Sequence, residues 1–327
     1  MSDPTAVGAG ITGRLHDPNE PGRLREQGRE HEDAENRDDK PRSLLTDAWD
    51  DLRHSAVFWV SLTLVVIFVT MAIFPQLFTH KDPLQCDAAN SVGPPSKQAY
   101  FGYDIQGCDV YARTVYGARA SIAVGFAATI VALVLGAGVG VYAGYYGGVT
   151  DTLLSRITDI FFAIPVLLGS IIVLSAFPTN ERASQTIAIS KVALALAILG
   201  WTATARQARA SVIQVKHADY VLAARSLGAS NWRIIRRHII PNSLAPIIVL
   251  TTISLGAFIG AEATLSYLGI GLQPPLVSWG IAISDGQEYI QTYPNLVFFP
   301  ALFLSLTVLA FIMLGDAIRE ALDPKLN

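Results

Sequence analysis

Long apolar runs constrain this chain more than any other feature, because a helix needs about 20 mostly apolar residues to cross the roughly 30 Å core of a bilayer. Six segments meet this requirement, at about residues 56–78, 120–146, 157–177, 187–208, 244–265 and 296–318. Each is predicted to be helical, since backbone groups in lipid must find their partners within the segment. Charged residues make up only 16% of the 327 residues, against about 25% in an average soluble domain. We therefore predict an all-α integral membrane protein with six transmembrane helices.

The basic residues predict how such a protein is oriented. The linker after the fourth apolar segment contains seven of them: Arg206, Arg209, Lys216, Arg225, Arg233, Arg236 and Arg237. Residues 266–295 contain none. Because cytoplasmic loops are enriched in Lys and Arg, we expect the basic linker to be cytoplasmic, and an even number of spans puts both termini on the same side. Residues 79–118 and 266–295 are then expected to face outward.

The first 45 residues differ in composition from the rest of the chain. They are rich in Arg, Asp and Glu and poor in large apolar side chains. Such a segment buries too little apolar surface to offset chain entropy, so we predict a disordered cytoplasmic tail over residues 1–45. It lacks the apolar stretch of a cleaved signal peptide, and we expect it to stay attached. Both a solvated tail and a docking arm fit this composition.

Glycines recur every four residues in the second apolar segment and just beyond it. They are Gly136, Gly140, Gly144 and Gly148. This spacing places them on one face of a helix and lets a second helix approach closely in lipid. A glycine-rich nucleotide loop would need a preceding strand and a later acidic residue, and both are missing. We therefore predict a helix-packing face.

Patterns typical of catalysis and of cofactor binding are missing from the sequence. It contains no G-x-x-x-x-G-K-[ST] loop, no H-E-x-x-H motif and no cluster of Cys and His. These patterns mark phosphate-binding loops and zinc sites, so we expect no catalytic residue, no metal site and no ATP hydrolysis in this chain. A membrane-embedded enzyme would need paired acids within a span, whereas Asp159, Glu262 and Asp316 lie near the ends of three different segments.

Two cysteines, Cys86 and Cys108, are the only ones in the chain, and both fall in the same predicted outer loop. Thiols are readily oxidised outside the cytoplasm, so the two form either a disulfide or a pair of free thiols. Intact mass before and after a reductant distinguishes these alternatives.

Several charged residues lie near the ends of predicted spans. Arg156 and Asp159 are one helical turn apart, which favours an ion pair. Lys191 and Glu262 lie near the outer ends of the fourth and fifth segments, where long side chains can reach the membrane surface. An ionisable residue within a span is a functional candidate, but positions near the ends favour a structural role.

The stretch YVLAARSLGASNWRIIRRHIIPN, residues 220–242, lies between two apolar segments. We predict a short helix over Val221–Leu227, which Gly228 ends by adopting a left-handed conformation. Ser230 is expected to cap a second helix, and Pro241 to terminate it.

The second helix is predicted to be amphipathic, with opposite faces formed by Arg233, Arg236 and Arg237 and by Trp232, Ile235 and Ile239. Such a helix can lie on anionic lipid, but that role does not explain the Ala–Gly element before it.

The pattern A-A-x-x-x-G followed by R-H-x-x-P-N resembles the EAA loop of bacterial ABC-transporter import permeases. The matching residues are Ala223, Ala224, Gly228, Arg237, His238, Pro241 and Asn242. Leu222 stands where that family has Glu. The resemblance implies that residues 219–242 form a coupling helix that seats in a groove of a separate ATP-hydrolysing subunit.

Three more segments resemble the C-type permease subunits of dipeptide and oligopeptide importers. They are FGYDIQGCDVYARTVYGARAS (101–121), LSYLGIGLQPPLVSWG (265–280) and LGDAIREALDP (314–324). The residues of the first that match are Gly102, Asp104, Gly107, Asp109, Arg113, Tyr116, Gly117, Ala118 and Arg119. Tyr103 stands where Thr is usual, and Cys108 where Arg is usual. The change to Cys108, paired with Cys86, fits an added external disulfide.

The resemblance implies a type I ABC importer transmembrane fold in a bacterial plasma membrane. Its expected divisions are a tail (1–45), a first transmembrane helix with an external loop (46–116), a five-helix permease core (117–318) and a cytoplasmic C-terminus (319–327).

The same resemblance implies a set of partners. They are a second homologous permease subunit, two ABC ATPase subunits that bind ATP and Mg, and an extracytoplasmic substrate-binding protein, for which residues 271–293 are a candidate surface. We expect this chain itself to bind no cofactor and no nucleic acid.

The implied cargo is a dipeptide or oligopeptide, with nickel or another small solute as the alternative. A self-sufficient channel or secondary transporter would instead be expected to show charge relays or broken spans near the bilayer midplane. The sequence indicates neither.

Overall fold

The computed structural model of the chain describes residues 44–178 and 184–322. The predicted tail lies outside these residues except for its last two, and so does the end of the chain from residue 323. The chain divides into two compact units, Met1–Asp47 and Ala48–Asn327, and the packing given below is that of the second unit.

All named elements of the described residues are helical. The α-helices are α2 (Leu44–His54), α3 (Ala56–Ile73), α4 (Val110–Tyr146), α5 (Gly148–Phe162), α6 (Val166–Ala176), α7 (Gln185–Val215), α8 (Asp219–Ser226), α9 (Asn231–Ile234), α10 (Ile240–Tyr267), α11 (Trp279–Gly286) and α12 (Asn295–Ala321). Short 3₁₀ turns are η1 (Pro75–Leu77), η2 (Ala88–Asn90) and η4 (Gln287–Tyr289), whereas η3 (Ile235–Ile239) is a π-helix.

Within residues 44–178 and 184–322, five helices are long and apolar enough to cross a membrane: α3, α4, α7, the continuous helix Asn231–Tyr267, and α12. A sixth span results if α5 and α6 are taken together. The prediction of an all-α protein with six apolar segments agrees with the six spans that result when α5 and α6 are taken as one. The segment ends differ, however, since α4 begins at Val110 and α7 continues to Val215.

The third predicted span is not one continuous helix. α5 and α6 meet at an angle of 80°, and the residues between them include Pro165. Proline has no N–H to donate, and it disfavours the helical conformation in the residue before it. The expectation that no span is broken is therefore wrong at residues 163–165.

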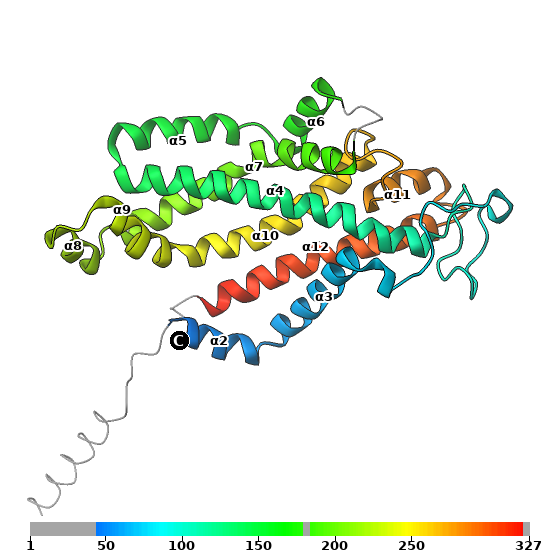
Figure 1. Cartoon of the computed structure of the whole chain (residues 1–327), viewed down its shortest axis with the longest axis horizontal. Coiled ribbons are helices and arrows are strands. Elements are labelled where there is room, and N and C mark those ends of the chain that lie inside the picture. The colour runs from blue at the N-terminus through cyan, green and yellow to red at the C-terminus, as the bar shows by residue number, and fades with distance from the viewer. Residues whose placement is uncertain (1–43, 179–183, 323–327) are drawn as a thin grey trace, which may run out of the picture. The chain divides into compact units, whose positions relative to one another are not determined.

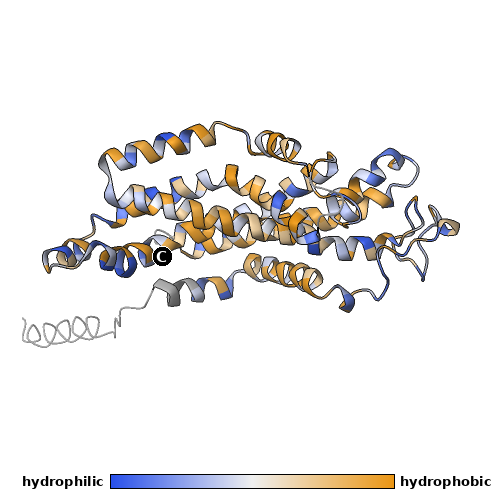
Figure 2. Ribbon diagram, turned by 45° about the horizontal axis from the view of Figure 1, so that its top comes forward, coloured by the Kyte–Doolittle hydropathy of each residue, from blue (hydrophilic) through white to orange (hydrophobic). Residues whose placement is uncertain are grey.

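The long helices of the unit pack side by side (Figure 1). α4 lies along α7, α10 packs against α4, α7 and α12, and α3 packs against α12 and α4. α8 and α9 lie at one end of this bundle, and α11 lies with residues 74–109 at the other (Figure 1). Apolar residues dominate the middle of the long helices, whereas polar residues gather toward these two ends (Figure 2).

Small residues allow α4 to lie close to α7. A Cβ added at Gly136 would lie 2.7 Å from Thr204 Cβ, one at Gly140 2.7 Å from Ala208 Cβ, and one at Gly144 3.0 Å from Val212 Cβ. The distances at Gly136 and Gly140 are shorter than real Cβ atoms show, so these two positions admit only glycine, and the contact at Gly144 is tighter than most real Cβ contacts.

Gly148 does not belong to this face, which corrects the fourth position of the predicted series. α4 ends at Tyr146, and Gly148, with φ +59°, is the first residue of α5. A Cβ there would meet no heavy atom within 4 Å. The predicted four-residue spacing of the glycines therefore extends beyond Tyr146, where the helix ends.

The segment between α3 and α4 is tied down by charged residues. Arg113 of α4 forms ion pairs with Asp104, at 2.5 Å, and with Asp285 of α11, at 3.2 Å. The other oxygen of Asp104 accepts hydrogen bonds from the backbone N–H groups of Gln106 and Cys108. Arg113 thus joins three parts of the chain at the end of the bundle that carries α11.

A disulfide joins Cys86 to Cys108 in this segment, across a sequence separation of 22 residues. Replacing both cysteines with serine is expected to lower the free energy of unfolding by about 3 kcal/mol, because the unfolded chain loses a closed loop of this size. A lower melting temperature in mild detergent would show this loss. The wild type should gain the mass of two hydrogens on reduction, and a chain whose mass does not change contradicts the bridge.

Glu262 lies in the core, not at the membrane surface where the sequence predicts it. Its side chain is 0% exposed, and one carboxyl oxygen accepts a hydrogen bond of 2.7 Å from Ser266 Oγ. The reason is that α11 folds back over this end of α10, so closely that a Cβ at Gly280 would lie 2.8 Å from Ser266 Cβ.

Candidate coupling surface and neighbouring cleft

Residues 219–242 form a bent helical segment, called the elbow below, at one end of the bundle (Figure 1). Its first helix, α8, ends at a turn in which Gly228 has φ +81°. The N–H of Ala229 donates to the carbonyl of Ala224 at 3.1 Å, and the N–H of Gly228 donates to the carbonyl of Arg225 at 3.0 Å. A left-handed glycine with such bonds is a common helix end.

The second helix of the elbow starts as the sequence predicts, with Ser230 Oγ accepting a hydrogen bond from the N–H of Arg233 at 3.4 Å. Its inner face is fully or almost fully buried. That face packs with Val221 against residues of α4 and α7, and consists of Ile234, Ile235 and Ile239. Tyr145, at the end of α4, donates a hydrogen bond of 2.9 Å to Asn231 Oδ1. The elbow is therefore fixed to the ends of two long helices.

Two details of the predicted second helix are wrong. Trp232 is 68% exposed and lies outside the buried face, where Ile234 is found in its place. Pro241 does not terminate the helix, because α9, η3 and α10 form one continuous helix from Asn231 to Tyr267. In η3 the N–H of Ile240 donates to the carbonyl of Ile235, five residues back, and this wider turn precedes the proline.

Most residues of the predicted coupling set lie on the outside of the elbow. Ala223, Gly228, Arg237, Pro241 and Asn242 are exposed, whereas Ala224 and His238 are intermediate. Asn242 Nδ2 donates a hydrogen bond of 2.7 Å to the carbonyl of His238, which holds the two helical turns around Pro241 together. The structure thus brings the seven residues into one small region.

The exposed surface of the elbow combines apolar and basic side chains. Leu227, beside the glycine turn, is 89% exposed, and Leu222 is 45% exposed. The exposed basic residues of the elbow are Arg225, Arg233, Arg236 and Arg237. The elbow therefore presents an exposed leucine at a fixed turn together with four exposed positive charges.

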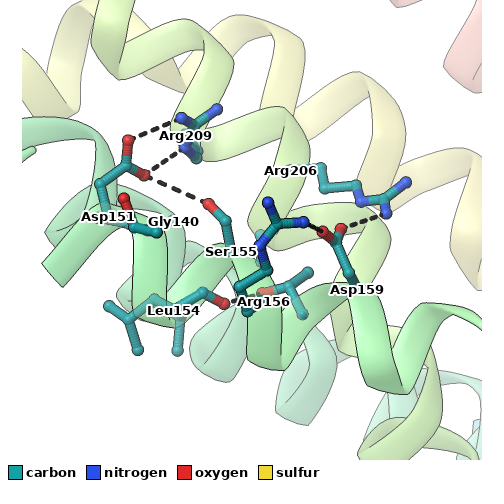
Figure 3. A pocket seen from close by; sticks show the side chains of 13 residues that line it. Gly140, Asp151, Leu154, Ser155, Arg156, Asp159, Arg206 and Arg209 are labelled. Carbon is teal, nitrogen blue, oxygen red and sulfur yellow. Dashed lines mark hydrogen bonds and ion pairs between the residues drawn. The ribbon is translucent and has the colours of Figure 1, made fainter. Parts of the chain in front are cut away.

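A cleft of about 480 Å³ opens between α4, α5 and α7, and Figure 3 shows the charged side chains in it. Asp151 of α5 accepts two hydrogen bonds from Arg209 of α7, one of them 2.7 Å long. Asp159, also on α5, accepts a hydrogen bond of 2.7 Å from Arg206 of α7. Arg156 lies 3.7 Å from the other oxygen of Asp159. These contacts hold the two helices together across the cleft.

The sequence predicts only part of this network. The pair of Arg156 with Asp159 follows from their spacing along one helix. The pairs of Asp151 with Arg209 and of Asp159 with Arg206 join residues 58 and 47 positions apart. The sequence contains one indication of these cross-helix pairs. Arg206 and Arg209 are three residues apart, which places both side chains on one face of α7.

Metal ligands do not gather in this part of the protein. Among the described residues, no group of three or more His, Cys, Asp and Glu side chains is placed to hold a metal ion.

Two family models match the chain. The model of the binding-protein-dependent transport system inner membrane component matches residues 136–327. The model of the N-terminal transmembrane domain of oligopeptide transport permease C matches residues 43–95.

Curated relatives cover nearly the whole chain. The oligopeptide transport system permease protein OppC of Bacillus subtilis is 40% identical over 295 residues, which are 90% of this chain and 94% of that protein. The dipeptide transport system permease protein DppC of Alkalihalophilus pseudofirmus is 40% identical over 86% of this chain and 90% of that protein. The glutathione transport system permease protein GsiD of Pectobacterium atrosepticum is 33% identical over 89% of this chain and 94% of that protein.

A solved structure has a similar fold. A chain of the MetNI methionine ABC transporter, in an inward-facing conformation, is 21% identical with a TM-score of 0.50, and the match covers 64% of this chain and 96% of that chain. The family models, the relatives and this likeness of fold show that the chain belongs to the family of binding-protein-dependent transport system inner membrane components, with the transmembrane fold of type I ABC importers.

Proposed function

We propose that this chain is one membrane-spanning subunit of an ABC importer that translocates dipeptides or oligopeptides, driven by ATP hydrolysis in separate subunits. The elbow carries this proposal, because its second helix exposes Arg233, Arg236 and Arg237 and continues without a break into α10, while Leu227 is exposed at the turn before it. A force applied to the elbow would therefore reach the core of the bundle without being absorbed by a flexible loop. The relatives named for oligopeptide, dipeptide and glutathione transport support a peptide cargo.

The proposed assembly contains a second homologous permease subunit, two ATPase subunits that bind ATP and Mg, and an extracytoplasmic binding protein. The elbow and both termini face the cytoplasm of the bacterial cell, and α11 with residues 74–109 faces outward. The divisions at residues 45, 116 and 318 belong to the same proposal.

Gentle purification of the tagged protein from its native membrane, followed by reconstitution, tests the proposal. We expect a second permease and an ATPase to co-purify, and ATP-dependent uptake of labelled tri-alanine to require the binding protein. Uptake of nickel but not of peptide would overturn the cargo. A protein that purifies alone and transports without ATP would overturn the importer assignment as a whole.

A further inference from the structure

Peptides differ in their side chains, but every unmodified peptide carries one α-carboxylate. A permease that accepts many peptides can hold them all through this shared group. Guanidinium groups bind carboxylates through two parallel N–H donors. Within a peptide permease, an arginine that faces an open cleft and has no hydrogen bond is therefore suited to bind the α-carboxylate of a peptide.

The cleft between α4, α5 and α7 contains such an arginine. Its lining includes two carboxylates and three guanidinium groups, which leaves one positive charge unmatched. Arg209 is matched by Asp151, and Arg206 by Asp159, each at hydrogen-bond distance. Arg156 is the third cation. Its one ion pair among the described residues is that with Asp159, at 3.7 Å, which is too long for a hydrogen bond.

The surroundings of Arg156 leave it free to take a ligand. Its side chain is 78% exposed, and Figure 3 shows it beside Asp159 at the cleft. Asp159 keeps its hydrogen bond to Arg206 when Arg156 turns away, so no carboxylate is left unpaired. Arg206 in turn lies 3.8 Å from the ring centroid of Phe162, which holds that guanidinium in place.

The cleft also has the size for such a ligand, because its volume of about 480 Å³ lies within the roughly 300–1,000 Å³ of small-molecule sites. It opens between spanning helices, where charged side chains face a water-filled cavity or a partner.

We propose that Arg156 binds the α-carboxylate of the transported peptide in this cleft, with Arg206 as the neighbouring positive charge. The inference rests on the proposed function of peptide import. It assigns to the permease itself a contact with the cargo that does not depend on the peptide's sequence.

Equilibrium binding of labelled tri-alanine and of its C-terminal amide tests this assignment. The purified permease–ATPase complex is placed in lipid nanodiscs without the binding protein, so that the preference of the binding protein has no influence. We expect Arg156→Gln to weaken binding of tri-alanine about tenfold, the effect of one lost charge-assisted hydrogen bond. Binding of the amide should be weak in the wild type and unchanged by the substitution.

Two further variants serve as controls. Arg156→Lys keeps the positive charge but lacks the two parallel donors, so it should retain only part of the preference for the acid. Arg53→Gln removes an arginine that also pairs with an aspartate one helical turn away, Asp50 at 3.1 Å, but on α2 and outside the cleft. It should leave the binding of both peptides unchanged.

Each remaining outcome is decisive. If Arg156→Gln weakens the acid and the amide equally, Arg156 has a structural role or binds lipid phosphate, and the assignment is wrong. If the wild-type complex binds no tri-alanine, the cleft is not a peptide site. Uptake of tri-alanine by the complete importer would still support the proposed function in both cases, whereas a complete importer without peptide uptake would overturn the proposed function itself.

Discussion

Replacing Gly228 with valine is expected to lower peptide uptake about 5–30-fold while the protein still inserts into the membrane. Gly228 has φ +81°, and a left-handed conformation costs other residues about 1–2 kcal/mol. A cost of that size lowers the ratio of the native turn to other conformations of the elbow by about 5–30-fold. A Cβ at this position would meet no heavy atom within 4 Å, so backbone strain acts on the elbow without a clash that would disturb the bundle. Uptake and the amount of co-purifying ATPase subunit measure the effect.

The chain offers a matched control for this substitution. Gly269 has φ +75°, and a Cβ there would also meet no heavy atom within 4 Å, but it follows α10 at the opposite end from the elbow. Gly269→Val should suffer the same strain and still bind the ATPase subunit. Gly228→Asn should restore much of the uptake, since asparagine tolerates the left-handed region. Normal uptake and normal ATPase binding by Gly228→Val would show that the elbow does not couple the subunits.

The apolar segments were predictable because crossing a bilayer is a requirement on length and composition along one stretch of chain. The close packing of α4 on another helix was equally predictable, since Gly136, Gly140 and Gly144 are spaced by the helix period itself, but the sequence did not identify α7 as that helix. Residue spacing predicts the face of a helix correctly within the helix, but it does not show where the helix ends. Gly148 shows this, because it lies beyond the last turn of α4.

The two prolines that misled the sequence interpretation show a second limit. The sequence predicts a continuous span through Pro165, but the helix breaks there, with an angle of 80° between the helices on either side. The sequence predicts a helix end at Pro241, but the helix continues through this residue. The residue has the same missing N–H in both places. What differs is whether neighbouring turns rearrange their hydrogen bonds, as η3 does before Pro241, and a sequence pattern does not carry that information.

Contacts between distant parts of the chain were the least predictable. Glu262 is buried because α11 returns over the end of α10, and Arg113 pairs with Asp285 across 172 residues. The cleft arises in the same way, since its cross-helix pairs depend on how α5 lies against α7. Spacing along one helix indicated that Arg156 and Asp159 are neighbours, but only the fold shows that Arg206 satisfies Asp159 and leaves Arg156 without a hydrogen bond.

Replacing Gly140 with isoleucine should cause a large loss of stability. A Cβ at Gly140 alone would lie 2.7 Å from Ala208 Cβ and 2.9 Å from the backbone nitrogen of Arg209. Backbone atoms of α7 cannot move aside as a flexible side chain can, so α4 and α7 must separate along their contact. Overpacking of a core costs about 1–3 kcal/mol and sometimes more. We expect about 3 kcal/mol here, seen as a fall of about 5 °C in the melting temperature in mild detergent.

A substitution of Gly138, on the same helix, distinguishes overpacking between α4 and α7 from a general effect of losing a glycine. A Cβ at Gly138 would meet nothing within 4 Å, and isoleucine is a better helix former than glycine. Gly138→Ile should therefore leave the melting temperature unchanged or raise it slightly, although it lies only two residues from Gly140. Equal losses from both substitutions would mean that the close contact between α4 and α7 does not hold the bundle together. A loss at Gly140 alone would also predict weaker tri-alanine binding, because Gly140 lines the cleft and the spacing of its walls depends on that contact.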